Sequence, residues 1–98
     1  MDREKVKERD HYLCITCGAP GESIHHVIKR ERAKVCSMVN SEYNLVVKCT
    51  KCHEKSHNDK ARYKDLQYLI SKYGVQIYDS APIDDWRMLL RRKDELGE

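Results

Sequence analysis

The spacing of apolar residues predicts a long helix over about residues 52–73, in the second half of the chain. Apolar residues recur there at helical intervals; they are Tyr63, Leu66, Leu69, Ile70 and Tyr73. Gly74 then stands where a glycine commonly ends a helix. We expect this apolar stripe to face the core of the protein.

A second amphipathic helix is predicted over about residues 82–96. Pro82 suits the first turn of a helix, and Trp86, Leu89 and Leu90 trace one apolar face. The segment from 75 to 78, between the two helices, reads as a brief extended stretch. The chain therefore ends in helical structure.

The first half of the chain has a different pattern. Residues 1–10 are dense in charge, with Val6 as the one interior apolar residue, which indicates a short solvated helix. Two stretches rich in β-branched residues, 23–28 and 45–48, are predicted as strands, and an irregular basic segment joins them. Short strands combined with helices place the chain in the α+β class.

Composition limits the size of the core. The chain has 98 residues, of which 36% are charged and none is Phe, so we expect a single domain spanning 1–98 with a small apolar interior. A metal ion is a common way to stabilise so small and polar a domain. No apolar run reaches the roughly 20 residues that span a bilayer, and no signal-peptide pattern opens the chain, so we expect a cytoplasmic protein without a membrane partner.

Four of the five cysteines form two C-x2-C pairs, which predict a structural metal site. The pairs are Cys14 with Cys17 and Cys49 with Cys52. In a reducing compartment such pairs favour Zn²⁺ over disulfides, because four thiolates from two tight turns close a tetrahedral shell. A rubredoxin-like iron site and two unrelated buried cysteine pairs are the alternatives. Cys36 is expected to be a small apolar filler or an exposed thiol.

Histidines indicate a second site next to the first. His53 and His57 are four residues apart, so a helix starting near Cys52 would place both imidazoles on one face, where they could share a metal. His25 and His26 belong to the first predicted strand. Neighbouring residues on a strand face opposite sides, so these two would need a local twist or bulge to serve one site.

In combination, these motifs resemble the HNH endonuclease family. The resemblance covers Cys14 to His57 and consists of a His-His pair followed by an apolar residue, an Asn-Leu pair, a C-x2-C-H motif and a final histidine. It implies a small zinc-stapled ββα-metal (His-Me finger) core with additional N- and C-terminal helices. It also implies a phosphodiester hydrolase of the small stand-alone type found in phages and bacteria.

The resemblance assigns a role to each matching residue. His26 would be the general base that activates water, and Asn44 would brace the loop between the strands and help to orient it. His25, His53 and His57 would bind one catalytic divalent ion. Many family members have Asp in place of His25 and lack a ligand at the position of His57. Three imidazoles favour Zn²⁺, Ni²⁺, Co²⁺ or Mn²⁺ over Mg²⁺, which prefers oxygen.

Basic residues near these motifs are candidates for binding DNA. They are Lys29, Arg30, Arg32, Lys34, Lys51 and Lys55, together with Lys48. Such side chains contact phosphates without reading bases, although a net charge of +3 is weak evidence by itself and each could be an ordinary surface residue. The expected partner is DNA, with a phage packaging (terminase) complex as a further one.

A non-catalytic zinc module that binds nucleic acid or a protein is the alternative to an endonuclease. In that interpretation the histidines are structural. The tyrosines of the 63–73 stripe could also stack on bases, although a role in the core is the simpler interpretation.

Overall fold

The computed structural model describes residues 2–97, so the two ends of the predicted 1–98 domain lie outside the described residues. It confirms a small α+β protein with a two-stranded antiparallel sheet. The elements are α1 (Arg3–Arg9), β1 (Ser23–His26), η1 (Arg30–Lys34), η2 (Ser37–Asn40), η3 (Glu42–Asn44), β2 (Leu45–Lys48), α2 (Thr50–Glu54), α3 (Asp59–Tyr73), α4 (Gln76–Asp79), α5 (Asp85–Arg91) and α6 (Lys93–Leu96). The labels η1 to η3 denote 3₁₀ turns.

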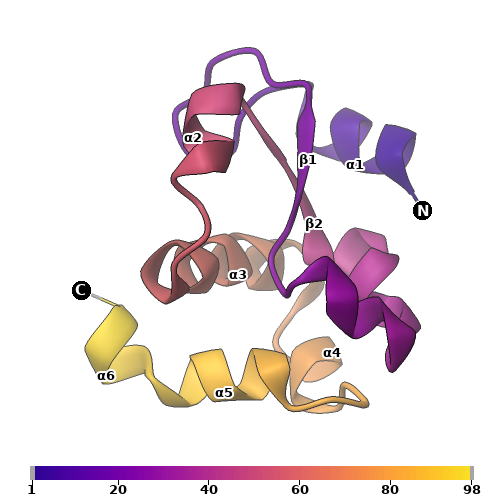
Figure 1. The fold of residues 1–98 in the computed structure, drawn as a ribbon, viewed down its shortest axis with the longest axis vertical. Helices are drawn as coiled ribbons and strands as arrows, with labels where there is room; N and C mark the ends of the chain where they lie inside the picture. Colours follow the sequence, from indigo (N-terminus) through magenta and orange to yellow (C-terminus); the bar gives the residue numbers. More distant parts are fainter. Residues whose placement is uncertain (1, 98) are drawn as a thin grey trace.

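The two strands stand between helices (Figure 1). Their register is continuous, from Ser23 opposite Lys48 to His26 opposite Leu45, without a bulge. The strand predicted over 23–28 therefore ends two residues early. In Figure 1, α1 and α2 lie on opposite sides of the strands, and α3 separates the strands from α5.

The sheet has a buried residue at every position of β2. Leu45 and Val47 pack with Val6 of α1, whereas Val46 belongs to the larger core cluster that includes Leu66 of α3. Because side chains alternate along a strand, one face of the sheet is covered by α1 and the other by α3. The same alternation decides where the histidines of β1 point.

The first helix is less solvated than its charge pattern suggests. Val6 is fully buried, and Asp10, which follows the helix, is buried as well. One carboxylate oxygen of Asp10 accepts the backbone N–H of Val47 at 3.0 Å, and Arg9 contacts both oxygens. The expectation of a solvated helix is wrong on this side, because Asp10 accepts from Val47 and Arg9 donates to the carbonyl of Leu45, which fastens the end of α1 to β2.

The helix predicted over 52–73 is two helices. The first, α2, ends at Glu54, and α3 begins at Asp59. Ser56 is buried in the break and its hydroxyl donates to the carbonyl of Cys52 at 2.6 Å. Asn58 then caps α3 by accepting the N–H of Ala61 at 2.9 Å. Local side-chain hydrogen bonds of this kind compete with a continuous helix and end it.

The last quarter of the chain differs from its prediction in the same way. The segment from 75 to 78 was expected to be extended, but it belongs largely to the helical turn α4, where Tyr78 is fully buried near Trp86. The helix expected over 82–96 is divided into α5 and α6 at Arg92. Arg92 binds both Asp59 of α3 and Glu95 of α6. Tertiary contacts override the simple helical period here.

The apolar stripe of α3 lies in the core, as expected. Tyr63, Leu66 and Leu69 are buried, and Ile70 and Tyr73 pack against the same cluster. With 15 residues, α3 is the longest of the described helices, and none of them has the length and apolar character to cross a bilayer.

Candidate metal centre

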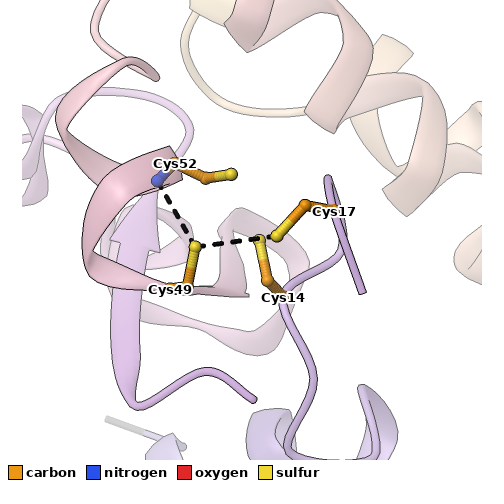
Figure 2. A group of neighbouring side chains, drawn as sticks. All are labelled: Cys14, Cys17, Cys49 and Cys52. Carbon is orange, nitrogen blue, oxygen red and sulfur yellow. Dashed lines mark hydrogen bonds between the residues drawn. The ribbon is translucent and has the colours of Figure 1, made fainter. Parts of the chain in front are cut away.

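Four cysteine sulfurs converge where the loop after α1 meets the start of α2 (Figure 2). The four Sγ atoms lie within 4.8 Å of one another, and those of Cys17 and Cys49 are 3.7 Å apart. Gly18 adopts a φ of +79°, which glycine tolerates without strain, and its N–H donates to the carbonyl of Cys14 at 2.9 Å. This tight turn brings Cys17 back beside Cys14.

Backbone amides at the cluster favour thiolates. Burial by itself raises the pKa of Cys14, but backbone N–H groups of Cys49, Cys17 and Thr16 lower it to about 6. The pKa of Cys49 is also lowered, chiefly by the backbone N–H of Cys52. In contrast, hydrogen bonds to the sulfurs of Cys49 and Cys17 raise the pKa of Cys52 to about 12. Without a cation, therefore, the four neighbouring sulfurs do not all become thiolates at neutral pH, and Cys52 keeps its proton.

A divalent cation removes this conflict, because it binds all four sulfurs as thiolates. The donor set, its compact spacing and its two tight turns fit a structural Zn²⁺. A shell of four protein ligands is closed, so the ion held there stabilises the fold. Cys36 takes no part: it is buried in the apolar core, as expected for a small filler residue.

Three imidazoles form a second group. His25 comes from β1, His53 from α2, and His57 from the break between α2 and α3. Their ring centroids are 5.0 Å (His25–His53), 5.3 Å (His25–His57) and 5.6 Å (His53–His57) apart, and one nitrogen of each lies within 4.8 Å of the others. His53 and His57 were expected on one face of a continuous helix. They meet instead because the chain turns after Glu54.

The buried imidazoles are held neutral. Burial, followed by the charges of His53 and Lys48, lowers the pKa of His25 to about 3. Burial and the charge of His57 lower the pKa of His53. Neutral imidazole is the form that binds a metal, so His25 and His53 do not have to lose protons at neutral pH before they bind an ion.

The histidine group is open on one side. His25 is buried, His53 is half-buried and His57 is exposed. The last two line a hollow of about 260 Å³, together with Ser23, Thr50 and Glu54. Three protein ligands with access to solvent are the arrangement of a catalytic metal site, in contrast to the closed cysteine cluster.

His26 lies apart from this group. It follows His25 on a strand without a bulge, so the alternation of side chains turns it towards the face of the sheet that carries Leu45. Its Nε2 is 2.9 Å from Oδ1 of Asn40 in η2, and it does not line the hollow beside His53. Its charge nevertheless contributes to the lowered pKa of His53, so the two rings are within electrostatic reach.

Asn44 braces the connection between the strands. The side chain is fully buried and makes four hydrogen bonds. Its Oδ1 accepts from the N–H of Ile28 (2.9 Å) and from Nε1 of Trp86 (3.1 Å), and its Nδ2 donates to the carbonyls of Ile28 (3.0 Å) and Val39 (2.9 Å). Asn44 thus fixes the loop that follows His26 without a side-chain contact to that histidine among the described residues.

The basic candidates divide into two groups. Lys29, Arg30, Arg32 and Lys34 lie in or next to η1, whereas Lys51 and Lys55 lie in or next to α2; all six are exposed. Arg32 forms an ion pair with Asp85 of α5 at 3.1 Å. Lys48 is not a surface residue: it is 1% exposed, and its Nζ donates to Asp65 at 2.8 Å and to Thr16 at 2.5 Å. Its expected contact with DNA is wrong.

The site includes residues that sequence reasoning missed. Asn40 contacts His26, Glu54 lines the hollow, and Asp65 lies 4.0 Å from Nε2 of His25. The burial of Asp65 could have been predicted from the sequence, because Asp65 directly precedes Leu66 in a helix whose apolar residues face the core. No comparable signal marks Asn40 or Glu54.

The fold and the two donor groups describe a small α+β protein with a four-cysteine cluster that could hold a structural zinc and a neighbouring group of three histidines. No family model and no solved structure match the chain. A 49-residue stretch is 41% identical to a protein of Sarcophyton glaucum described as a mitochondrial DNA mismatch repair protein mutS homolog. The match covers 48% of this chain and 5% of that protein, so the chain spans only a small part of that relative.

Proposed function

We propose that this protein is a metal-dependent DNA endonuclease of the HNH type. The observation that carries the proposal is the group of His25, His53 and His57, which combines three imidazole donors with an open side. A two-stranded antiparallel sheet followed by α2 is also consistent with the ββα-metal core that the sequence resemblance implies.

The three histidines would hold one divalent ion. When bound, such an ion supplies positive charge that polarises a phosphate oxygen and stabilises the departing 3′ oxygen. Because the donors are all nitrogen, we expect Zn²⁺, Ni²⁺, Co²⁺ or Mn²⁺ to bind more tightly than Mg²⁺. Glu54 adds one carboxylate to the rim of the hollow.

His26 is proposed as the general base. An amide oxygen only accepts hydrogen bonds, so the contact with Oδ1 of Asn40 selects the His26 tautomer with a proton on Nε2. Nδ1 then keeps the lone pair that takes a proton from water. Asn44 is proposed as a positioning residue, because it fixes the loop that leaves His26.

Exposed lysines supply a surface for the DNA backbone. Lys55, Lys60 and Lys64 line a hollow of about 510 Å³ at the break between α2 and α3. Within residues 2–97 none of the three forms an ion pair, so their charges are available to phosphates. Lys51 is a further exposed lysine, in α2. The similarity to a protein described as a DNA mismatch repair homologue independently favours DNA as the partner.

A plasmid-cleavage assay tests the proposal. Supercoiled plasmid is incubated with the protein and, separately, Mg²⁺, Mn²⁺, Co²⁺, Ni²⁺ or Zn²⁺. We expect cleavage with at least one of these ions, and a loss of about 10²–10⁴-fold in His26→Ala with the zinc content unchanged. His11→Ala is the matched control, because His11 is an exposed histidine outside both donor groups.

The alternative is a non-catalytic zinc module. One observation favours it: His26 belongs to the opposite face of the sheet and lies outside the hollow beside His53. Equal rates for the wild type and His26→Ala would remove His26 from the reaction. Absence of cleavage with every ion would leave only the module.

A further inference from the structure

A chain of polar groups links the cysteine cluster to the histidine group, and all of them except Thr16 are buried. Thr16 lies between Cys14 and Cys17, and its hydroxyl accepts from Nζ of Lys48 at 2.5 Å. Lys48 precedes Cys49 and donates to Oδ1 of Asp65 at 2.8 Å. The second oxygen of Asp65 faces Nε2 of His25 at 4.0 Å.

The two atoms at the last step of this series of contacts both lack a hydrogen-bond partner. Nε2 of His25 and Oδ2 of Asp65 are the buried side-chain atoms without a hydrogen-bond partner in the described part of the protein. Both residues are at least 97% buried, so bulk solvent does not reach these atoms. One atom is a possible donor and the other an acceptor, and it is unfavourable to leave buried polar groups without partners. A small movement of either side chain would satisfy both.

We propose that Asp65 is the carboxylate that orients His25 for metal binding, by accepting a hydrogen bond from its Nε2. An imidazole that donates from Nε2 has only Nδ1 left for an ion. Metal-bound histidines commonly use their second nitrogen in this way, and the partner fixes the tautomer and the ring orientation. This inference rests on the proposed role of His25 as a ligand.

Asp65 acts through His25 and is not a fourth ligand. The nitrogens of His25, His53 and His57 lie within 4.8 Å of one another, and no oxygen of Asp65 belongs to that group. Asp65 is also engaged by Lys48 through its other oxygen. It is therefore a positioning residue behind the site.

Lys48 gives the carboxylate a fixed direction. Its ammonium is 2% exposed and bridges Thr16 of the cysteine turn and Asp65 of α3. The position of Asp65, and hence that of His25, therefore depends on the turn that the structural ion holds. The cysteine site thus helps to position the histidine group through the contacts of Thr16, Lys48 and Asp65.

The tautomer of His25 is the first test, and it needs no variant. The protein is prepared with one zinc per chain, and the imidazole nitrogens are assigned by long-range ¹H–¹⁵N correlation. We expect a proton on Nε2 of His25 and none on Nδ1. A proton on Nδ1 would overturn the proposal, whether or not the protein cleaves DNA.

The second test measures metal affinity. Ni²⁺ is titrated calorimetrically into the wild type, Asp65→Asn and the matched control Asp59→Asn, which changes another ion-paired carboxylate of the same helix, half-buried and outside the histidine group. We expect Asp65→Asn to weaken Ni²⁺ binding about 10–100-fold and the control to leave it nearly unchanged. Equal affinity in the two variants contradicts the proposal. If Asp65→Asn does not fold, the tautomer of the wild type decides.

Discussion

Asn44 is the residue on which the connection between the strands most depends. It satisfies the N–H and carbonyl of Ile28, the carbonyl of Val39 and the indole of Trp86, all in the interior. One side chain thereby joins β1, the 3₁₀ turns and α5. In the sequence it was recognised only through the resemblance to a nuclease motif.

We expect Asn44→Ala to lower the free energy of unfolding by about 3 kcal/mol or more, because it leaves several buried groups without partners. Urea denaturation followed by circular dichroism measures the change. Asn40→Ala, at a half-buried position, is the control and should cost clearly less. Similar values for the two variants would show that the four bonds of Asn44 do not stabilise the fold.

Lys48 and Asp65 form a buried ion pair, so removal of one partner should be costly. Lys48→Met leaves the Asp65 carboxylate without its cation, and we expect a loss of about 3–5 kcal/mol in the free energy of unfolding. The double variant Lys48→Met/Asp65→Asn no longer buries a charge and should recover part of that loss. Additive effects in this double-mutant cycle would contradict a direct interaction between the two side chains.

The break between α2 and α3 determines where His57 lies. His57 occupies the turn that follows α2, and Asn58 starts α3 by capping the N–H of Ala61. A continuous helix over 52–73 would have placed the imidazole differently. The short break therefore places His57 within the histidine group.

Loss of the cap should loosen this break. We expect Asn58→Ala to lower the free energy of unfolding by about 1 kcal/mol, the usual cost of losing an N-cap side chain. Asn58→Asp keeps an acceptor oxygen and should retain most of the stability. Urea denaturation of both variants provides the measurement, and equal losses would argue against capping by this side chain.

At the level of elements, the sequence predicts contacts that repeat with a period or a motif. Both strands, the stripe of α3 and the four-cysteine cluster follow from such patterns. It does not predict the break at Ser56, because that depends on a hydrogen bond to Cys52. Nor does it predict the burial of Lys48, because its partner Asp65 comes from a different element.

A structural metal ion would stabilise the whole molecule, because its apolar core is small. The cysteine cluster joins the loop after α1 to α2, two segments that are far apart in the sequence (Figures 1 and 2). Structural Zn²⁺ contributes roughly 10–16 kcal/mol of apparent binding free energy in small zinc domains. This is comparable to the entire stability of an ordinary domain.

We therefore expect Cys17→Ser to reduce zinc binding and to cause substantial unfolding, although Cys17 is exposed and its loss leaves no cavity. Metal analysis and near-ultraviolet circular dichroism measure the two effects. Cys36→Ala is the control, since Cys36 is a buried cysteine outside the cluster and its loss should leave the zinc content unchanged. A folded Cys17→Ser protein without zinc would contradict a structural role for the cluster.

We expect the closed sulfur site and the neighbouring open imidazole site each to hold an ion. Native mass spectrometry of the protein with excess Zn²⁺ tests it most directly. We predict two ions per wild-type chain and one in His25→Ala/His57→Ala. A single ion in the wild type at every zinc concentration would contradict the claim.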